Sequence, residues 1–289
     1  MRIYKKKVHT MKNILSVFII TFLVLSCKGQ NSSNQSKNDW ALHKLAGKVK
    51  KIKEIMYLGD GLSKSIKEAS ETSYNENGYI IHAYSHGTFD KAASTTSISY
   101  DQNNKIKEAK MFDPDNNEIM KVTYGYSKDG KEIDTKVENK SINITYSEKI
   151  INTYNNANQL VGTKTLQDGK LRSIISIKDS ANQKITEEKL LDSAGKLKSK
   201  TIKKFDKKDN LLEKSEYGGP DAKDLEFKVI FKYNERNHPV EITKYNNDGS
   251  TEYKDSSEYV YDKIGNWIKR TDFSDGEIDT VTERKVEYY

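Results

Sequence analysis

The chain has 289 residues, of which 35% are hydrophobic and 31% charged, and its formal net charge is +7 at pH 7. Five of its 49 basic residues precede an apolar stretch at the N-terminus, which leaves 44 basic against 42 acidic residues in the rest of the chain. A charge so close to balance gives no electrostatic basis for binding nucleic acid. Aromatic residues make up 10% of the chain, which argues against disorder, and its polarity predicts strands with one buried and one solvated face.

The first 26 residues have the pattern of a secretory signal peptide. Basic residues are followed by an almost wholly apolar stretch at 14–25, as in the n-region and h-region of such signals. This stretch is too short for a transmembrane helix, which needs about 20 residues. Met11 is an alternative start that would open a signal of the usual length.

The residues Val24, Leu25, Ser26 and Cys27 resemble the lipobox of bacterial lipoproteins. The resemblance implies cleavage between Ser26 and Cys27, a diacylglycerol group on the Cys27 thiol, and an acylated new N-terminus. Cys27 is the only cysteine of the chain, so the sequence offers no intrachain disulfide. Lys28 follows where an aspartate would be an inner-membrane retention signal, and the analogy therefore indicates the outer membrane, with the facing side left open.

The next elements in chain order are a tether and a long β region. We expect residues 27–39 to be the acylated cysteine followed by a flexible polar tether. Residues 40–289 are predicted to form one β array. Trp40 to Ala46, between Asp39 and Gly47, predict one or two helical turns at its start.

A short pattern recurs along the rest of the chain: an aromatic residue, then Asp or Asn, then a Gly or Asn turn three or four positions later. The clearest copy contains Tyr261, Asp262, Gly265, Asn266 and Trp267. From position 177 onward the copies start at 177, 191, 205, 217, 233, 245, 261 and 273. Each step has room for one strand and one turn.

The segments between these turns alternate as half-buried strands do. Trp267, Lys269 and Phe273 are predicted on one face of their strand, with Arg270 and Asp272 on the other. Four Asp-Gly pairs, ending at glycines 130, 169, 249 and 276, predict tight hairpin turns with positive φ.

These units resemble the YD repeats of the Rhs and teneurin families, and those of small Bacteroidetes-type lipoproteins with degenerate YD repeats. The resemblance covers roughly residues 70–285. It implies an antiparallel β array, which in the large family members coils into a shell around a toxin domain. This chain is too short for a closed shell, so we expect an all-β fold: an elongated, open antiparallel meander with a short N-terminal helix at most.

Few residues have the spacing of a catalytic or metal site. His82 and His86 are four apart in a predicted strand, where they would be about 13 Å apart, too far for one metal ion. Residues 113–117 resemble the start of a calcium loop, but Glu118 stands where glycine is needed, so we predict a turn. His43 and His238 have no partner that spacing can identify. We expect no metal and no cofactor.

The remaining polar and aromatic patterns have structural explanations. A Tyr or Phe at each turn entry is predicted to pack neighbouring units together, with a stacking ladder for sugars as the alternative. The lysine pairs at 203–204 and 207–208 are interleaved with acids and indicate solvated turns.

The sequence therefore predicts a non-enzymatic lipoprotein of the cell envelope, held in the outer membrane by lipid on Cys27, that binds an envelope protein or a glycan. Two alternatives remain open. One is a lipid or lipoprotein carrier with an apolar concave sheet, and the other is a hydrolase. The side chains of the concave face would distinguish the three.

Overall fold

The computed structural model describes residues 38–59, 65–87, 91–180 and 182–289, so Ser26, Cys27 and most of the predicted tether lie outside the described residues. The helical elements are α2 (Asp39–Leu42) and a 3-10 turn, η1 (Pro220–Ala222). Within these ranges no helix is long and apolar enough to cross a membrane. The strands are β1 (Val49–Leu58), β2 (Ile66–Tyr74), β3 (Ile80–Gly87), β4 (Lys91–Tyr100), β5 (Ile106–Phe112), β6 (Glu118–Tyr126), β7 (Glu132–Asn139), β8 (Ile144–Tyr154), β9 (Leu160–Gln167), β10 (Lys170–Asp179), β11 (Lys184–Leu191), β12 (Leu197–Phe205), β13 (Leu211–Gly218), β14 (Asp224–Tyr233), β15 (Pro239–Asn246), β16 (Thr251–Tyr261), β17 (Trp267–Ser274) and β18 (Glu277–Tyr288).

The strands form one antiparallel meander, as the sequence predicts. Each strand pairs with the strands before and after it in the chain. The pattern starts at 191, 205, 233 and 261 are the last residues of β11, β12, β14 and β16. The repeat spacing therefore predicts the order of the strands. It also predicts the last residue of four of the eight strands that follow position 180.

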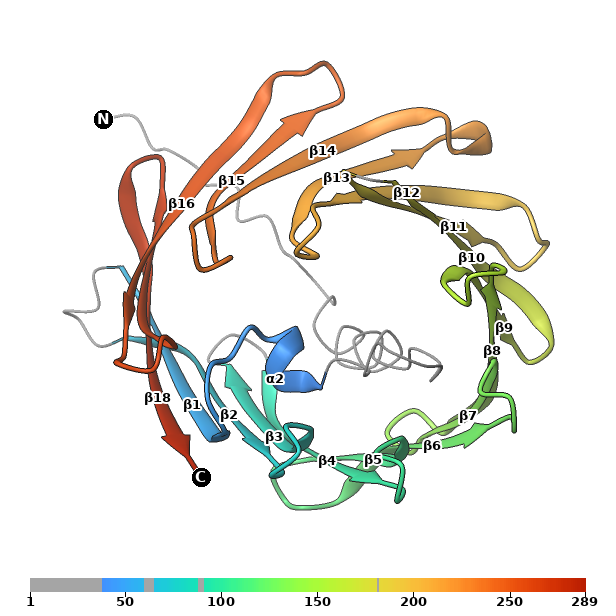
Figure 1. The fold of residues 1–289 in the computed structure, drawn as a ribbon, viewed down its shortest axis with the longest axis horizontal. Helices are drawn as coiled ribbons and strands as arrows, with labels where there is room; N and C mark the ends of the chain where they lie inside the picture. Colours follow the sequence, from blue (N-terminus) through green and yellow to red (C-terminus); the bar gives the residue numbers. More distant parts are fainter. Residues whose placement is uncertain (1–37, 60–64, 88–90, 181) are drawn as a thin grey trace.

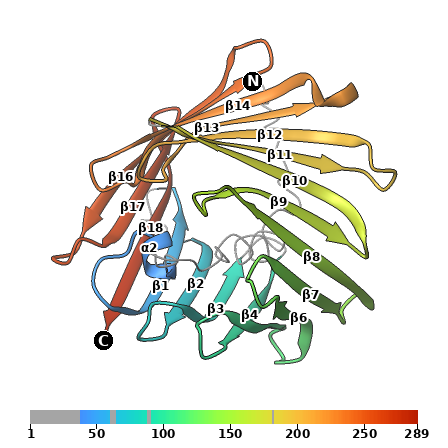
Figure 2. The same cartoon turned by 45° about the vertical axis from the view of Figure 1, so that its right-hand side comes forward.

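The expectation of an open array is wrong, because the two ends of the sheet pair with each other. β1 runs antiparallel to β18 from Val49 opposite Tyr288 to Leu58 opposite Thr280. The described strands therefore close into an 18-stranded ring (Figures 1 and 2). Closure depends on the summed twist and stagger of all the strands, which the local spacing of turns does not determine. It also removes the two exposed sheet edges.

A β-bulge follows the best-matched turns and changes which side chains share a face. Tyr261 is opposite Trp267 while Val260 is opposite Lys269, so residue 268 is the extra one. Trp267 consequently lies on the same face as Arg270 and not, as predicted, with Lys269. Bulges of this kind bend and twist a strand, and equivalent register shifts follow the turns at 75–79, 101–105, 155–159, 206–210 and 234–238.

The two faces of the sheet become an inner and an outer wall. Helix α2 lies inside the ring (Figure 1), and its Trp40, together with Leu45 beyond the helix, packs on the cluster that contains Ile52 and Tyr74, which therefore belong to the inner wall. Residues directly opposite each other in an antiparallel pair share a face. Lys53, next to Ile52, is opposite Glu71 and points outward.

The outer wall is held by ion pairs between neighbouring strands. They include Lys53 with Glu71 (3.0 Å), Lys121 with Glu108 (3.0 Å), Lys149 with Glu132 (3.0 Å), Lys204 with Glu213 (2.9 Å), and both Lys232 (2.8 Å) and Lys254 (3.0 Å) with Glu241. Pairs as exposed as these contribute about 0–1 kcal/mol each. Charged side chains therefore recur around the outer wall.

Three of the recurring tyrosines bond to the preceding hairpin, as expected of groups that pack neighbouring units together. The hydroxyls of Tyr100, Tyr126 and Tyr233 donate to the carbonyl oxygens of the first residues of β3, β5 and β13 at 2.6, 2.9 and 2.8 Å. Basic side chains also cover aromatic faces, for example Lys184 over Phe205 at 4.8 Å from the ring centroid. Covered faces are not free to stack on a sugar.

Candidate functional site

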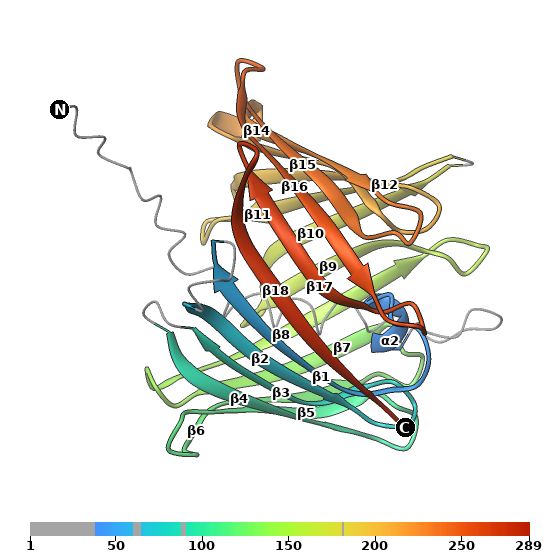
Figure 3. The ribbon, with the colours of Figure 1, turned by 90° about the vertical axis from the view of Figure 1, so that its left-hand side faces the viewer.

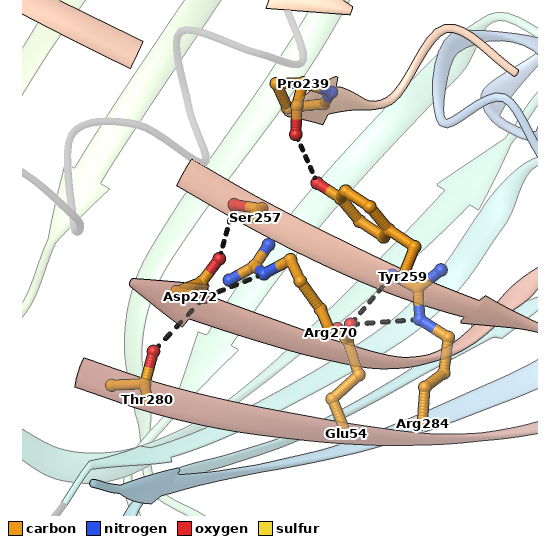
Figure 4. Close-up of polar contacts among 8 residues, drawn as sticks. All are labelled: Glu54, Pro239, Ser257, Tyr259, Arg270, Asp272, Thr280 and Arg284. Carbon is orange, nitrogen blue, oxygen red and sulfur yellow. Dashed lines mark hydrogen bonds and ion pairs between the residues drawn. The ribbon is translucent and has the colours of Figure 1, made fainter. Parts of the chain in front are cut away.

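A polar cluster on the inner wall of β14–β18 and β1 joins charged and aromatic side chains from neighbouring strands. Figure 4 shows Glu54, Arg270, Asp272 and Arg284 pointing toward one another from neighbouring strands. The register explains the grouping, because Glu54 is opposite Arg284 and Arg270 is opposite Thr282. The bulge at the start of β17 adds Trp267 to the same face.

Arg284 is the centre of this cluster. Its Nε and Nη2 donate to one carboxylate oxygen of Glu54 at 3.0 and 2.7 Å. Its guanidinium lies 3.4 Å from the centroid of the Trp267 ring, a distance at which cation–π attraction is strong. The Arg284 side chain is only 12% exposed. Burial lowers the pKa of Arg284, and the Glu54 carboxylate opposes that shift.

The second ion pair of the cluster is Arg270 with Asp272. Arg270 Nε donates to Asp272 Oδ2 at 2.9 Å, and Asp272 also accepts hydrogen bonds from Ser257 (2.7 Å) and Thr280 (3.1 Å). The carboxylate is thereby fixed on three sides. Arg270 keeps 29% of its side chain exposed, so its remaining guanidinium N–H groups can meet a ligand.

His238 and two tyrosines border the cluster at the β14–β15 turn. His238 stacks on Tyr259 with ring centroids 5.3 Å apart, and its Nδ1 is 3.0 Å from the Tyr261 hydroxyl. The Tyr259 hydroxyl donates to the carbonyl of Pro239 at 2.8 Å (Figure 4). Burial and then the nearby Lys44 lower the pKa of His238 to about 4. The ring is therefore neutral at pH 7 and acts as a packing group.

Residues 38–48, here called the strap, run along one end of the barrel against these turns, and Figure 3 shows α2 at this end in a side view. Asn266 is 2% exposed and forms two hydrogen bonds with the strap backbone. It accepts from Ala46 N–H and donates to Ala46 C=O, both at 2.8 Å. Lys44 Nζ donates to Asn237 O at 2.8 Å and to Asn210 Oδ1. At its other end Trp40 N–H donates to Gly78 O at 3.2 Å.

Another part of the inner wall is apolar. Ile98, Ala109, Val122 and Val137 are directly opposite one another along β4, β5, β6 and β7, and all four are buried. β6 is six strands from β18 in a ring of 18, so this apolar row lies about a third of the way round the barrel from Arg284 (Figure 1). The inner wall thus has one apolar side and one side rich in arginine and aromatic residues.

A separate hollow of about 570 Å³ lies along segments 123–125, 134–136 and 145–147, with Asp168 beside them. Gly125 contributes no side chain there. The outer-wall side chains along these segments are short or polar, among them Thr123, Asp134 and Ser147, and Asp168 is held by Ser147 N–H at 2.9 Å. The hollow is remote from the charged cluster in the strand order.

The other residues singled out in the sequence fall into strands and turns. Asp262 Oδ1 accepts from the N–H groups of Gly265 (2.8 Å) and Asn266 (2.9 Å), and Gly265 has φ of 108°. His82 and His86 both lie on β3, and residues 113–117 connect β5 to β6. The described residues contain no group of three or more His, Cys, Asp or Glu that could hold a metal ion.

Sequence reasoning did not find the cluster around Arg284. Its members come from β1, β17 and β18, and Glu54 meets Arg284 only because the barrel closes. Two signals were present in the sequence, the arginines at 270 and 284 and the tryptophan at 267. The arginines cannot be given a partner as long as closure of the barrel is unknown. The tryptophan was predicted on the wrong face of β17, because the bulge was not predicted.

Comparisons with known proteins give little help in assigning the site. No family model matches the chain, and no curated protein matches it. Among solved structures it is similar to a porin-like protein from Bacteroides uniformis ATCC 8492, with 12% identity, a TM-score of 0.40, and coverage of 83% of this chain and 98% of that one. A porin-like protein from Bacteroides vulgatus ATCC 8482 matches with 13% identity, a TM-score of 0.34 and the same coverage. Likenesses at this level carry no inference about function.

Proposed function

We propose that this protein is a non-enzymatic binding barrel of the cell envelope, tethered to the outer membrane by lipid on Cys27, that takes its ligand against the inner wall. The observation that carries the proposal is the contrast between the walls. The outer wall carries lysine–carboxylate pairs suited to water, whereas the inner wall adds to pairs of this kind, such as Lys214 with Glu216, a group of arginine, tyrosine and tryptophan side chains on β14–β18.

The charged outer wall opposes a barrel embedded in lipid. A lysine or arginine that faces the middle of a bilayer costs about 2–4 kcal/mol, and outward lysines such as Lys121, Lys204 and Lys254 recur around the ring. A barrel in water needs another link to the membrane. The lipobox-like residues before Cys27 supply one.

A glycan or a segment of another envelope protein fits the charged side of the inner wall best. Arg270 presents guanidinium N–H donors, and Tyr253 and Tyr259 add partly buried rings on the same wall. Planar donors and aromatic rings are common anchors in binding sites for such ligands. Barrels of 16–18 strands are wide enough that wall side chains need not fill them.

A lipid or lipoprotein carrier is the second candidate, and the apolar row from Ile98 to Val137 favours it. Such a row would hold an acyl chain in place of a sugar or peptide. An apolar fluorescent probe should then gain intensity on binding, and Val122→Asp should abolish the gain. An unchanged signal in that variant would remove the carrier from consideration.

The proposal is tested with a photo-crosslinking residue at one of two neighbouring positions. Ser256 and Ser257 are adjacent on β16, but Ser256 is exposed on the outer wall and Ser257 is half-buried on the inner wall. In intact cells, crosslinks to a retained ligand are expected from position 257 only. Crosslinks from 256 alone, or equal yields from both, would contradict binding at the inner wall.

The anchor has its own test. Cys27→Ala should release the protein from the membrane fraction and block cleavage before residue 27. Unchanged membrane association, together with a mature N-terminus at another residue, would disprove the lipid anchor.

A further inference from the structure

We infer that the end of the barrel carrying the strap rests against the anionic bilayer surface that holds the Cys27 lipid, and that the other end points away from the membrane. The inference rests on the proposed anchor and adds an orientation to it. The strapped rim is defined as the strap and the turns 75–79, 101–105, 127–131, 155–159, 180–183, 206–210, 234–238 and 262–266. The far rim is defined as the turns 113–117, 140–143, 168–169, 192–196, 219–223, 247–250 and 275–276.

The strap fixes where the chain enters the barrel. Asn38 Nδ2 donates to Asn77 O at 2.8 Å, and Asp39 accepts from the N–H of Ile80 at 2.7 Å. Trp40 Nε1 donates to Val49 O at 2.8 Å. These bonds hold the first described residues, and with them the point where the tether joins the barrel, at the β2–β3 turn of the strapped rim.

The length of the tether limits the other orientation. Cys27 is 11 residues before Asn38, which gives a root-mean-square span of about 18 Å for a flexible chain and about 38 Å when fully extended. Strands of seven to twelve residues, tilted as in known barrels, give the barrel a depth of about 25 Å. With the far rim on the membrane, the tether would have to exceed its ordinary span merely to reach the strap.

The charges of the two rims favour the same orientation. The seven fully described turns of the far rim have seven carboxylates and three lysines, a net charge of −4; they are Asp113, Asp115, Asp168, Asp192, Asp221, Asp248 and Asp275, with Lys140, Lys196 and Lys223. The strapped rim has nine cations and eight carboxylates, a net charge of +1; they are Lys44, Lys48, Lys105, Lys128, Lys131, Lys207, Lys208, Arg236 and Lys263, with Asp39, Glu76, Asp101, Asp129, Asp206, Asp209, Glu235 and Asp262.

An anionic bilayer repels the far rim more than the strapped rim. The interaction free energy is about 1 kcal/mol for each charge close to the surface. The difference of five charges between the rims is therefore enough to bias a flexibly tethered barrel. Exposed apolar side chains favour neither orientation, because Ile264 lies at the strapped rim and Ile142 at the far rim.

The test places one fluorophore at either rim of the lipid-anchored full chain. Lys263→Cys on the strapped rim and Lys196→Cys on the far rim are a matched pair, because both are exposed turn lysines. In vesicles containing anionic phosphatidylglycerol and lipids with spin-labelled headgroups, quenching should be several-fold stronger at 263 than at 196. Equal quenching, or stronger quenching at 196, would overturn the orientation.

Two controls separate this outcome from failure of the anchor. The parent chain should take up no thiol dye, because Cys27 is its only cysteine and is expected to be acylated. Dye uptake by the parent, or loss of the vesicle-bound fraction, would refute the anchor and not the orientation. Replacing the anionic lipid by phosphatidylcholine should shrink the difference between the two positions, and an unchanged difference would refute the electrostatic part of the inference.

Discussion

The outer and inner walls of the barrel use their charged side chains differently. On the outer wall, lysines pair with carboxylates, as Lys121 does with Glu108, and both side chains stay about a quarter to a third exposed. On the inner wall, Arg284 is 12% exposed, bonds to Glu54 with two N–H groups and covers Trp267. Arg284 is thus less exposed than the lysines of the outer pairs, and also less exposed than Lys214, which pairs with Glu216 elsewhere on the inner wall.

The largest expected effect comes from removing the inner pair. Arg284→Ala removes the partner of the Glu54 carboxylate and exposes the Trp267 ring. We therefore expect the free energy of unfolding to fall by about 3 kcal/mol. Lys121→Ala on the outer wall should lower it by only about 0.5 kcal/mol. Urea denaturation of both variants measures the difference. Equal losses would mean that the two walls do not differ in this respect.

The next effect is a dependence on pH that belongs to the inner wall. The pKa of His238 is lowered to about 4, while an unfolded histidine titrates near 6.5. As the pH falls from 6.5 toward 4, the unfolded chain takes up a proton that the folded chain does not, so stability is lost across that window. The loss between pH 7 and pH 5 should be about 2 kcal/mol.

His238→Gln should flatten the stability profile between pH 6.5 and 4, measured by urea titrations at several pH values. His82→Gln on the outer wall controls for removal of an imidazole. A profile in His238→Gln as steep as that of the parent chain would show that another group is responsible.

A smaller effect is expected at the strap. Asn266→Ala removes both bonds to the Ala46 backbone and one to the Tyr288 hydroxyl, which leaves buried polar groups without these partners. We expect a loss of about 1.5 kcal/mol and faster hydrogen exchange at Ala46. Asn156→Ala, in the equivalent turn outside the strap, should change stability by less than about 0.5 kcal/mol. Unaltered hydrogen exchange at Ala46 would show that Asn266 does not hold the strap in place.

Much of the fold was predictable because it is local. The recurring motif predicts strands, turns and neighbour pairing, and the Asp-Gly pairs predict positive φ, which Gly130, Gly169, Gly249 and Gly276 adopt. What could not be predicted depends on the whole ring. The pairing of β1 with β18 joins segments more than 200 residues apart, and the partnership of Glu54 with Arg284 exists only after closure.

The bulges were the second source of error. A strict alternation from Trp267 places it on the face of Lys269, yet the extra residue at 268 turns the indole toward Arg270 and Arg284. One residue of slip exchanges the two faces of a strand. The sequence signal that could have predicted the slip is the repeated five-residue turn after an aromatic residue, as at 262–266 and 234–238.

The central claim, that the outer wall faces water and not lipid, is tested most directly by thiol labelling of the anchored protein in intact membranes. Lys121→Cys and Lys254→Cys each place one thiol at an outer-wall position on β6 and β16. Both thiols should react with a charged, water-soluble maleimide as fast in membranes as in detergent. Protection from that reagent in membranes, with rapid reaction toward an apolar maleimide, would place the outer wall in lipid and contradict the account.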